Sequence, residues 1–161
     1  MTWQQPEVLS VLERRLRLNL ERLDKAVNTT DPLTTPAVVA DVLDAFYVLG
    51  RVWRGDRAYG GLGEHEFDDA CRKDEGGEIV GALVYARGLA AHQRIVFGLF
   101  GDFYAKRYYN HYGCWVWQPL LTQSNDELAQ WYGKHLARHE VPLPLPAAER
   151  FLTESVKRLK Q

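Results

Sequence analysis

The stretch "EVLSVLERRLRLNLERLDKAV", from Glu7 to Val27, decides the fold class of the chain. Its apolar residues recur every three or four positions, which places them on one side of an α-helix. We predict a helix from Pro6 to about Asn28, because proline suits the first helical turn. Its arginines could bind phosphate, although the acids between them favour an ordinary solvated surface. The apolar side consists of Val8, Leu9, Leu12, Leu16, Leu20, Leu23 and Val27.

A second helix is predicted from Pro36 to about Trp53, with Thr35 as its N-cap. The short polar loop before it favours an antiparallel hairpin of the first two helices. Between Arg54 and Gly77 the helical spacing is lost, and glycines and charged residues become frequent. We therefore predict a flexible loop over 54–77. The apolar side of the second helix consists of Val39, Val42, Leu43, Phe46, Leu49 and Trp53.

The remaining elements are a third helix over about 77–96, an aromatic β-hairpin over about 102–119, and C-terminal helices over about 124–160. Aromatic residues favour strands, and "NHYG" supplies residues typical of a turn. Ser124 or Asn125 is the expected N-cap of the helix that follows the hairpin. The sequence thus predicts one mostly α-helical domain over 1–161, with about five helices and one small hairpin.

Composition excludes several classes of protein. The chain has 161 residues and a formal net charge of −1, which suits one domain and gives no overall basic field for nucleic acid. No signal peptide is visible, and no stretch approaches the roughly 20 apolar residues of a membrane helix. Cys71 and Cys114 lie too far apart for a CxxC motif, so we expect a cytoplasmic protein. His65 lies among acids but fits no metal-binding motif, so we predict no metal and no cofactor.

One polar pair interrupts the third predicted helix, in "YARGLAAHQR" from Tyr85 to Arg94. On a helical wheel, Arg87 falls near the middle of the apolar arc, where a charged side chain needs a partner, an interface or a wet cleft. His92 falls on another side, the side of Gly81 and Gly88. The two would converge only if the helix ended or bent near Gly88, or if a second copy of the chain supplied one of them.

Two interpretations of this pair are open. Histidine moves protons near neutral pH, and arginine binds phosphate through a planar fork of donors. Together they suit metal-independent cleavage of RNA, in which the 2′-hydroxyl attacks the adjacent phosphate. In the structural interpretation, Arg87 pairs with Asp41 or Asp44 of the second helix, and His92 is a hydrogen-bonded core residue.

The run from Arg87 to His92 resembles the Arg-x4–6-His motif of HEPN-domain proteins, many of which are ribonuclease toxins of toxin–antitoxin or antiphage systems. The all-helical context is similar over roughly the first two-thirds of the chain. The resemblance implies that Arg87 and His92 are catalytic, that two copies form a shared cleft, and that a cognate antitoxin protein exists. Active members often have Asn, Asp or His directly after the arginine, where this chain has Gly88.

RNA contacts are predicted at Arg94 and on the aromatic hairpin, where Lys106 and Arg107 lie beside Tyr108. Cations interleaved with aromatic side chains suit single-stranded nucleic acid. Alternatively, the aromatic side chains pack the hairpin on the helices. The alternative function is a non-catalytic helical module of a phage or mobile element that binds a partner protein.

Overall fold

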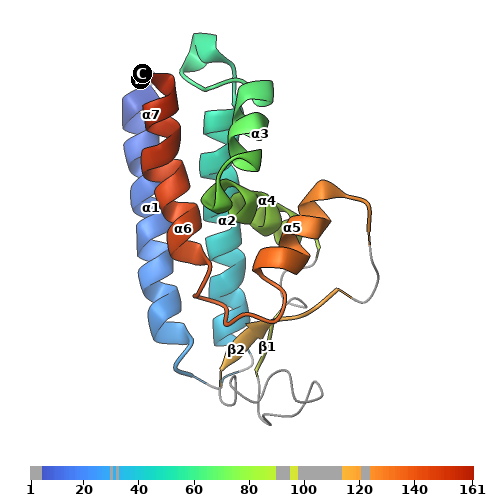
Figure 1. Cartoon of the computed structure of the whole chain (residues 1–161). Coiled ribbons are helices and arrows are strands. Elements are labelled where there is room, and N and C mark those ends of the chain that lie inside the picture. The colour runs from blue at the N-terminus through green and yellow to red at the C-terminus, as the bar shows by residue number, and fades with distance from the viewer. Residues whose placement is uncertain (1–4, 30, 32, 90–94, 98–113, 121–123) are drawn as a thin grey trace.

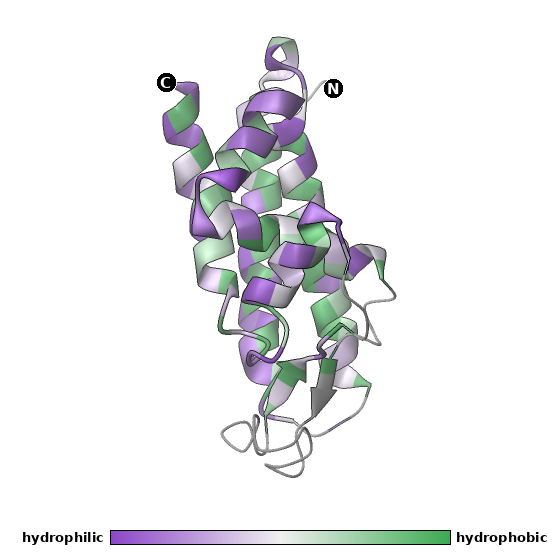
Figure 2. Ribbon diagram, turned by 45° about the vertical axis from the view of Figure 1, so that its right-hand side comes forward, coloured by the Kyte–Doolittle hydropathy of each residue, from purple (hydrophilic) through white to green (hydrophobic). Residues whose placement is uncertain are grey.

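A computed structural model of the chain describes residues 5–29, 31, 33–89, 95–97, 114–120 and 124–161. The described part is mostly helical, which confirms the predicted fold class (Figure 1). Each long helix carries both hydrophobic and hydrophilic residues, as amphipathic helices around a shared core do (Figure 2). None of the described helices combines the length and the apolar composition that crossing a membrane would require.

The first two helices are α1 (Gln5–Ala26) and α2 (Thr34–Arg54), and they pack antiparallel as predicted (Figure 1). Leu9, Leu16 and Leu23 of α1 are buried at seven-residue spacing, which gives the helix one continuous core-facing line. The predicted N-cap is wrong. Thr35 lies inside α2, and its buried hydroxyl donates to the carbonyl oxygen of Ala26 over 2.7 Å, so it ties the hairpin together.

The predicted flexible loop over 54–77 contains ordered structure instead. A short 3₁₀ turn, η1 (Arg57–Tyr59), precedes the helix α3 (Glu64–Arg72). Phe67 and Cys71 are one turn apart on α3 and both are buried in the core. Two apolar residues four positions apart are too few to register as a periodic pattern among the surrounding charges, and for that reason the sequence suggested a loop.

The central helix is α4 (Glu75–Gly88), which packs against α2 and α3 and against both C-terminal helical segments. Asp74 caps its start by accepting the backbone N–H of Gly76 over 2.8 Å. The prediction of one helix over 77–96 is wrong at its end, because Leu89 has extended backbone angles and residues 95–97 form a strand. The helix does end at Gly88. A helix end near Gly88 was one of the two conditions, besides a second copy of the chain, under which Arg87 and His92 could converge.

Two short antiparallel strands lie at one end of the bundle (Figure 1): β1 (Ile95–Phe97) and β2 (Trp115–Trp117). The predicted hairpin placed 115–117 in a strand, which is confirmed, but its described partner is β1. The predicted first arm and turn, within 102–113, lie outside the described residues. On its other edge β2 meets residues 138–141: Trp117 N–H donates to His139 O over 3.0 Å, and Val141 N–H donates to Trp115 O over 2.9 Å.

The C-terminal part consists of α5 (Glu127–His135) and a longer helical segment, made of α6 (Leu145–Arg150), a π-helical turn η4 (Phe151–Ser155) and α7 (Val156–Lys160). Asp126 caps α5 by accepting two backbone N–H groups, so the expected caps at Ser124 and Asn125 are wrong. The segment α6–α7 lies along α1, where Lys157 pairs with Glu13 over 2.7 Å (Figure 1).

Candidate functional site

Arg87 projects from the last turn of α4 onto the surface, where its side chain is 39% exposed. Its Nη2 and Nε donate to Oδ1 of Asp44 on α2, over 2.9 and 3.1 Å. On the helical wheel Arg87 fell near the middle of the apolar arc, where a partner, an interface or a wet cleft was expected; the partner is Asp44, one of the two acids that the structural interpretation named. Since α4 ends at Gly88, Arg87 is a residue of the last turn, and its side chain leaves the core at the end of the helix.

Asp44 is shared by two arginines. Besides Arg87 it accepts Nη2 of Arg15 from α1 over 2.9 Å, so one carboxylate connects α1, α2 and α4. Hydrogen bonds from Arg15 and then Arg87 lower the pKa of Asp44 below its usual value of 3.8. At neutral pH the three groups therefore carry one net positive charge, which is available to an external anion.

Tyr47 lies one turn after Asp44 on α2, and its ring contacts the guanidinium group of Arg87. The guanidinium carbon of Arg87 is 3.9 Å from the centre of the Tyr47 ring, and that of Arg51 is 5.8 Å from it. A guanidinium this close to an aromatic face is held by a cation–π interaction. Of the five N–H donors of Arg87, Asp44 takes two, and no described residue accepts the other three. Such a guanidinium is fixed in orientation and still able to bind an anion.

Beside Tyr47 lies a groove of about 430 Å³, which we call the α2–α5 groove because α2, α3, α4 and α5 all line it. Its floor includes the buried Phe67, Cys71 and Val80. Tyr47 and Trp131 are its aromatic lining residues besides Phe67. Burial raises the pKa of the Cys71 thiol to about 12, so that thiol is not a nucleophile at neutral pH.

Close packing of α4 on α5 fixes one wall of the α2–α5 groove. A methyl group at Gly81 would overlap the ring of Trp131, so the glycine is what lets Trp131 lie against α4. At Gly88, by contrast, no described atom lies within 4 Å of where a Cβ would sit. Glu78 strengthens the same contact by accepting His135 Nε2 at 2.5 Å and Lys134 Nζ at 2.8 Å.

The other residues of the predicted site, His92, Arg94, Lys106, Arg107 and Tyr108, lie outside the described residues. Only Arg87 is therefore placed by the structure. Sequence reasoning named Asp44 as one possible partner but missed Arg15, Tyr47 and the groove. A signal for Tyr47 was present, because Asp44, Tyr47 and Arg51 follow one another at helical spacing on α2.

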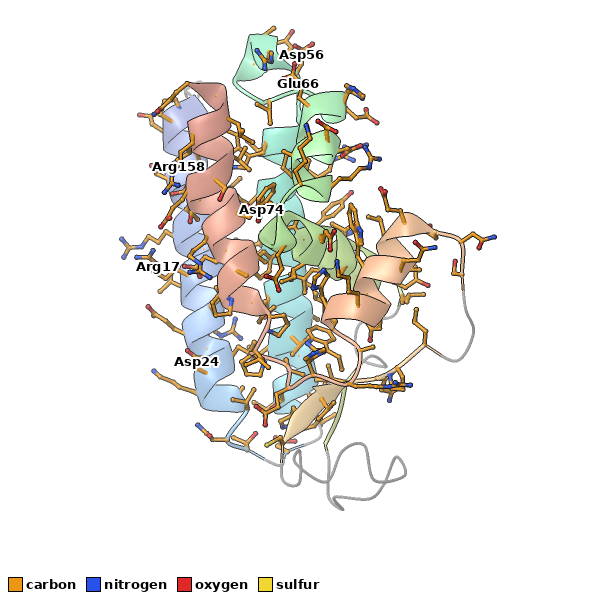
Figure 3. The ribbon with its side chains drawn as sticks, viewed as in Figure 1. Arg17, Asp24, Asp56, Glu66, Asp74 and Arg158 are labelled. Atoms are coloured by element: carbon orange, nitrogen blue, oxygen red, sulfur yellow. The ribbon has the colours of Figure 1, made fainter. Side chains whose placement is uncertain are left out.

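The acidic segment around His65 holds its carboxylates in ion pairs. Among the described residues no group of three potential ligands lies close enough to hold an ion. Its carboxylates pair with cations instead: Arg54 donates to Asp68 over 2.9 and 3.0 Å. Glu66, at the same end of the molecule as Asp56, accepts Arg57 (Figure 3).

Comparisons of the chain with models of known families, with curated protein sequences and with solved structures found no match. The resemblance to HEPN-domain proteins therefore rests on the residues from Arg87 to His92 and their helical context.

Proposed function

We propose that this protein is a metal-independent endoribonuclease in which Arg87 binds the scissile phosphate and His92 transfers protons. The observation that carries the proposal is the state of Arg87: exposed, in contact with the Tyr47 ring, oriented by Asp44, and with three N–H donors that no described residue accepts. Pre-orientation lowers the entropic cost of binding phosphate, because the guanidinium is already fixed.

In the proposed reaction the RNA 2′-oxygen attacks the adjacent phosphorus, and the bond from phosphorus to the 5′-oxygen breaks. His92 takes the proton of the 2′-hydroxyl, and the leaving 5′-oxygen gains a proton. The products are a 2′,3′-cyclic phosphate and a 5′-hydroxyl. Arg87 stabilises the charge that accumulates on the non-bridging oxygens, which are more negative in the transition state than in the substrate.

We further propose that two copies of the chain form the active cleft, and that the cellular role is that of a toxin or antiphage nuclease restrained by an antitoxin protein. The exposure of Arg87 supports a shared cleft, because its free donors can reach a groove between two copies. A cytoplasmic location suits Cys71 and Cys114, which are both free thiols. The toxin and antitoxin roles rest on the family resemblance.

Cleavage of a labelled RNA in EDTA tests the proposal. Wild-type protein should cut, and Arg87→Ala and His92→Ala should each lower the rate by about 10²- to 10³-fold. Arg14→Ala is the matched control. Arg14 is an exposed arginine of α1 with no ion pair in the described part of the chain, and its loss should leave the rate within about 2-fold. Undiminished cutting in both site variants would overturn the assignment.

A second candidate function is a non-catalytic module that binds a partner protein. The ion pair between Arg87 and Asp44 favours it, because that pair already gives Arg87 a partner within its own chain. Purification from native extract distinguishes the two. A stoichiometric protein partner without any cutting of RNA supports the module, whereas cutting that depends on Arg87 supports the nuclease.

A further inference from the structure

The α2–α5 groove combines an apolar interior with a charged rim. Its rim carries the three arginines Arg51, Arg54 and Arg72, and the two carboxylates Asp68 and Glu127. A volume of about 430 Å³ lies within the range that small-molecule sites occupy in proteins. Because its lining residues belong to four packed helices, the groove is formed before any ligand binds.

Among the described residues, Arg51 is the rim arginine without a carboxylate partner. Arg54 donates to Asp68 and Glu64, and Arg72 directs its Nε at both oxygens of Glu127 over 3.1 Å. Arg51 is exposed and pairs with no described carboxylate. The two carboxylates of the groove are thus neutralised, and Arg51 supplies its net positive charge.

Tyr47 connects this groove to the proposed catalytic arginine. The same ring lines the groove and lies 3.9 Å beneath the guanidinium carbon of Arg87. The guanidinium carbon of Arg51 also lies near this ring, 5.8 Å from its centre. A chain of alternating phosphates and bases bound at Arg87 would therefore meet the groove at the adjacent unit.

We propose that the α2–α5 groove binds one nucleotide unit, with the base between Tyr47 and Trp131 and a phosphate on Arg51. Unstacked bases are recognised in proteins by aromatic side chains on which they lie, which is the chemistry these walls offer. This inference rests on the proposed function, because it assigns the unit to the RNA that Arg87 would hold. A flat aromatic anion can contact both the aromatic side chains of the groove and the guanidinium of Arg51. An aliphatic acid would contact Arg51 alone.

Gly50 provides the sharpest test of the groove, because it lines the floor without contributing a side chain. A Cβ at this position would sit 3.9 Å from Val80, which is ordinary contact, so Gly50→Ala is accommodated. A larger residue extends into the space itself. Gly50→Leu should therefore fill the groove and weaken a bound nucleotide at least about 10-fold.

Isothermal titration calorimetry should be carried out with the four nucleoside monophosphates, a non-cleavable 2′-O-methyl oligoribonucleotide and inorganic phosphate. We expect the nucleotide probes to bind, and phosphate alone to bind at least 10-fold more weakly because it has no base. Arg51→Gln should weaken nucleotide binding about 10-fold. Trp131→Ala should weaken it roughly 5- to 150-fold. Arg14→Gln, an arginine on the far helix α1, should change it less than 2-fold.

Three results would overturn the proposal: no binding of any nucleotide probe, binding of phosphate as tight as that of nucleotides, or binding that survives both Gly50→Leu and Arg51→Gln. Circular dichroism and melting of Gly50→Leu confirm that the variant is folded. If Gly50→Leu is not folded, Arg51→Gln still decides the test, because Arg51 is exposed and its replacement leaves the core intact. Free monophosphates that bind as tightly as the oligonucleotide identify a small-molecule source, whereas much tighter oligonucleotide binding identifies RNA.

The test separates this inference from the nuclease proposal. Nucleotide binding that Gly50→Leu abolishes, in a protein that never cuts RNA, supports the groove and refutes the nuclease. Cutting that depends on Arg87 and continues at full rate in Gly50→Leu, without any nucleotide binding, supports the nuclease and refutes the groove.

Discussion

Replacing Asp44 with asparagine tests the arrangement that presents Arg87. The substitution keeps the size of the side chain and one oxygen acceptor but removes the negative charge. Two arginines, Arg15 and Arg87, then lie on either side of a neutral group and repel each other. We expect both guanidinium groups to lose their fixed positions, while α1, α2 and α4 stay together through their apolar contacts.

The expected loss of stability is modest, because all three side chains are accessible to water. Arg15, Asp44 and Arg87 are 41%, 40% and 39% exposed. Exposed ion pairs contribute about 0.2–1 kcal/mol each, so two pairs on one carboxylate predict a loss of about 0.4–2 kcal/mol at pH 7. The loss should shrink at high salt, which screens exposed charges.

The loss should also depend on pH in a defined direction. The pKa of Asp44 is lowered in the folded protein, so the folded state holds its proton less tightly than the unfolded state does. The stabilisation is fully present above the unfolded value near 3.8 and disappears as pH falls through the folded value. The difference in the free energy of unfolding between wild type and Asp44→Asn should therefore become smaller as pH falls from 7 to below 3.8.

Urea denaturation at several pH values measures these differences. Asp24→Asn is the control, because Asp24 is an exposed carboxylate of α1 with no ion pair among the described residues (Figure 3). It should change the free energy of unfolding by less than about 0.5 kcal/mol at any pH. A loss for Asp44→Asn below 0.2 kcal/mol at pH 7, or one that stays constant to low pH, would refute the reasoning.

Three further predictions concern the packing around the α2–α5 groove. Glu78→Gln should lower the free energy of unfolding by about 1.5–3 kcal/mol in denaturant titrations, because a charged acceptor that joins α4 to α5 is lost; an unchanged midpoint would contradict that role. Gly81→Ala should lower it by up to about 3 kcal/mol through overlap with Trp131, whereas Gly50→Ala should raise it by about 0.5–1 kcal/mol. Equal melting shifts for the two alanine variants would refute the difference in packing. Cys71 should react with a thiol reagent at pH 8 only after unfolding, because its pKa is about 12 in the folded protein; rapid labelling of native protein at this position would show that it is not buried.

The long helices were predictable because their apolar periodicity extends over many turns. Leu9, Leu16 and Leu23 identify the core side of α1 without knowledge of the other helices. The failures occurred where local patterns are short. With only Phe67 and Cys71 inward, α3 was taken for a loop. The apolar residues after Gly88 continued a helical pattern in the sequence, although Leu89 already has extended backbone angles.

The site was less predictable than the fold. A helical wheel orders residues around one helix but not along the surface of the bundle, so it placed Arg87 on the apolar arc without showing which of its possible surroundings the residue has. Its actual surroundings combine Arg15 from α1 with Asp44 and Tyr47 from α2, which lie far apart in sequence. Only the packing of three helices brings them together, and no spacing within one helix records that packing.

The chemistry of the cut RNA end tests the central claim most directly. A short RNA incubated with the protein in EDTA should yield fragments ending in a 2′,3′-cyclic phosphate, identified by mass spectrometry. The same sequence with 2′-deoxy sugars should stay intact, and Arg87→Ala should abolish the fragments from RNA. Cutting of the deoxy strand, a requirement for added metal, or full cutting by Arg87→Ala would contradict the account.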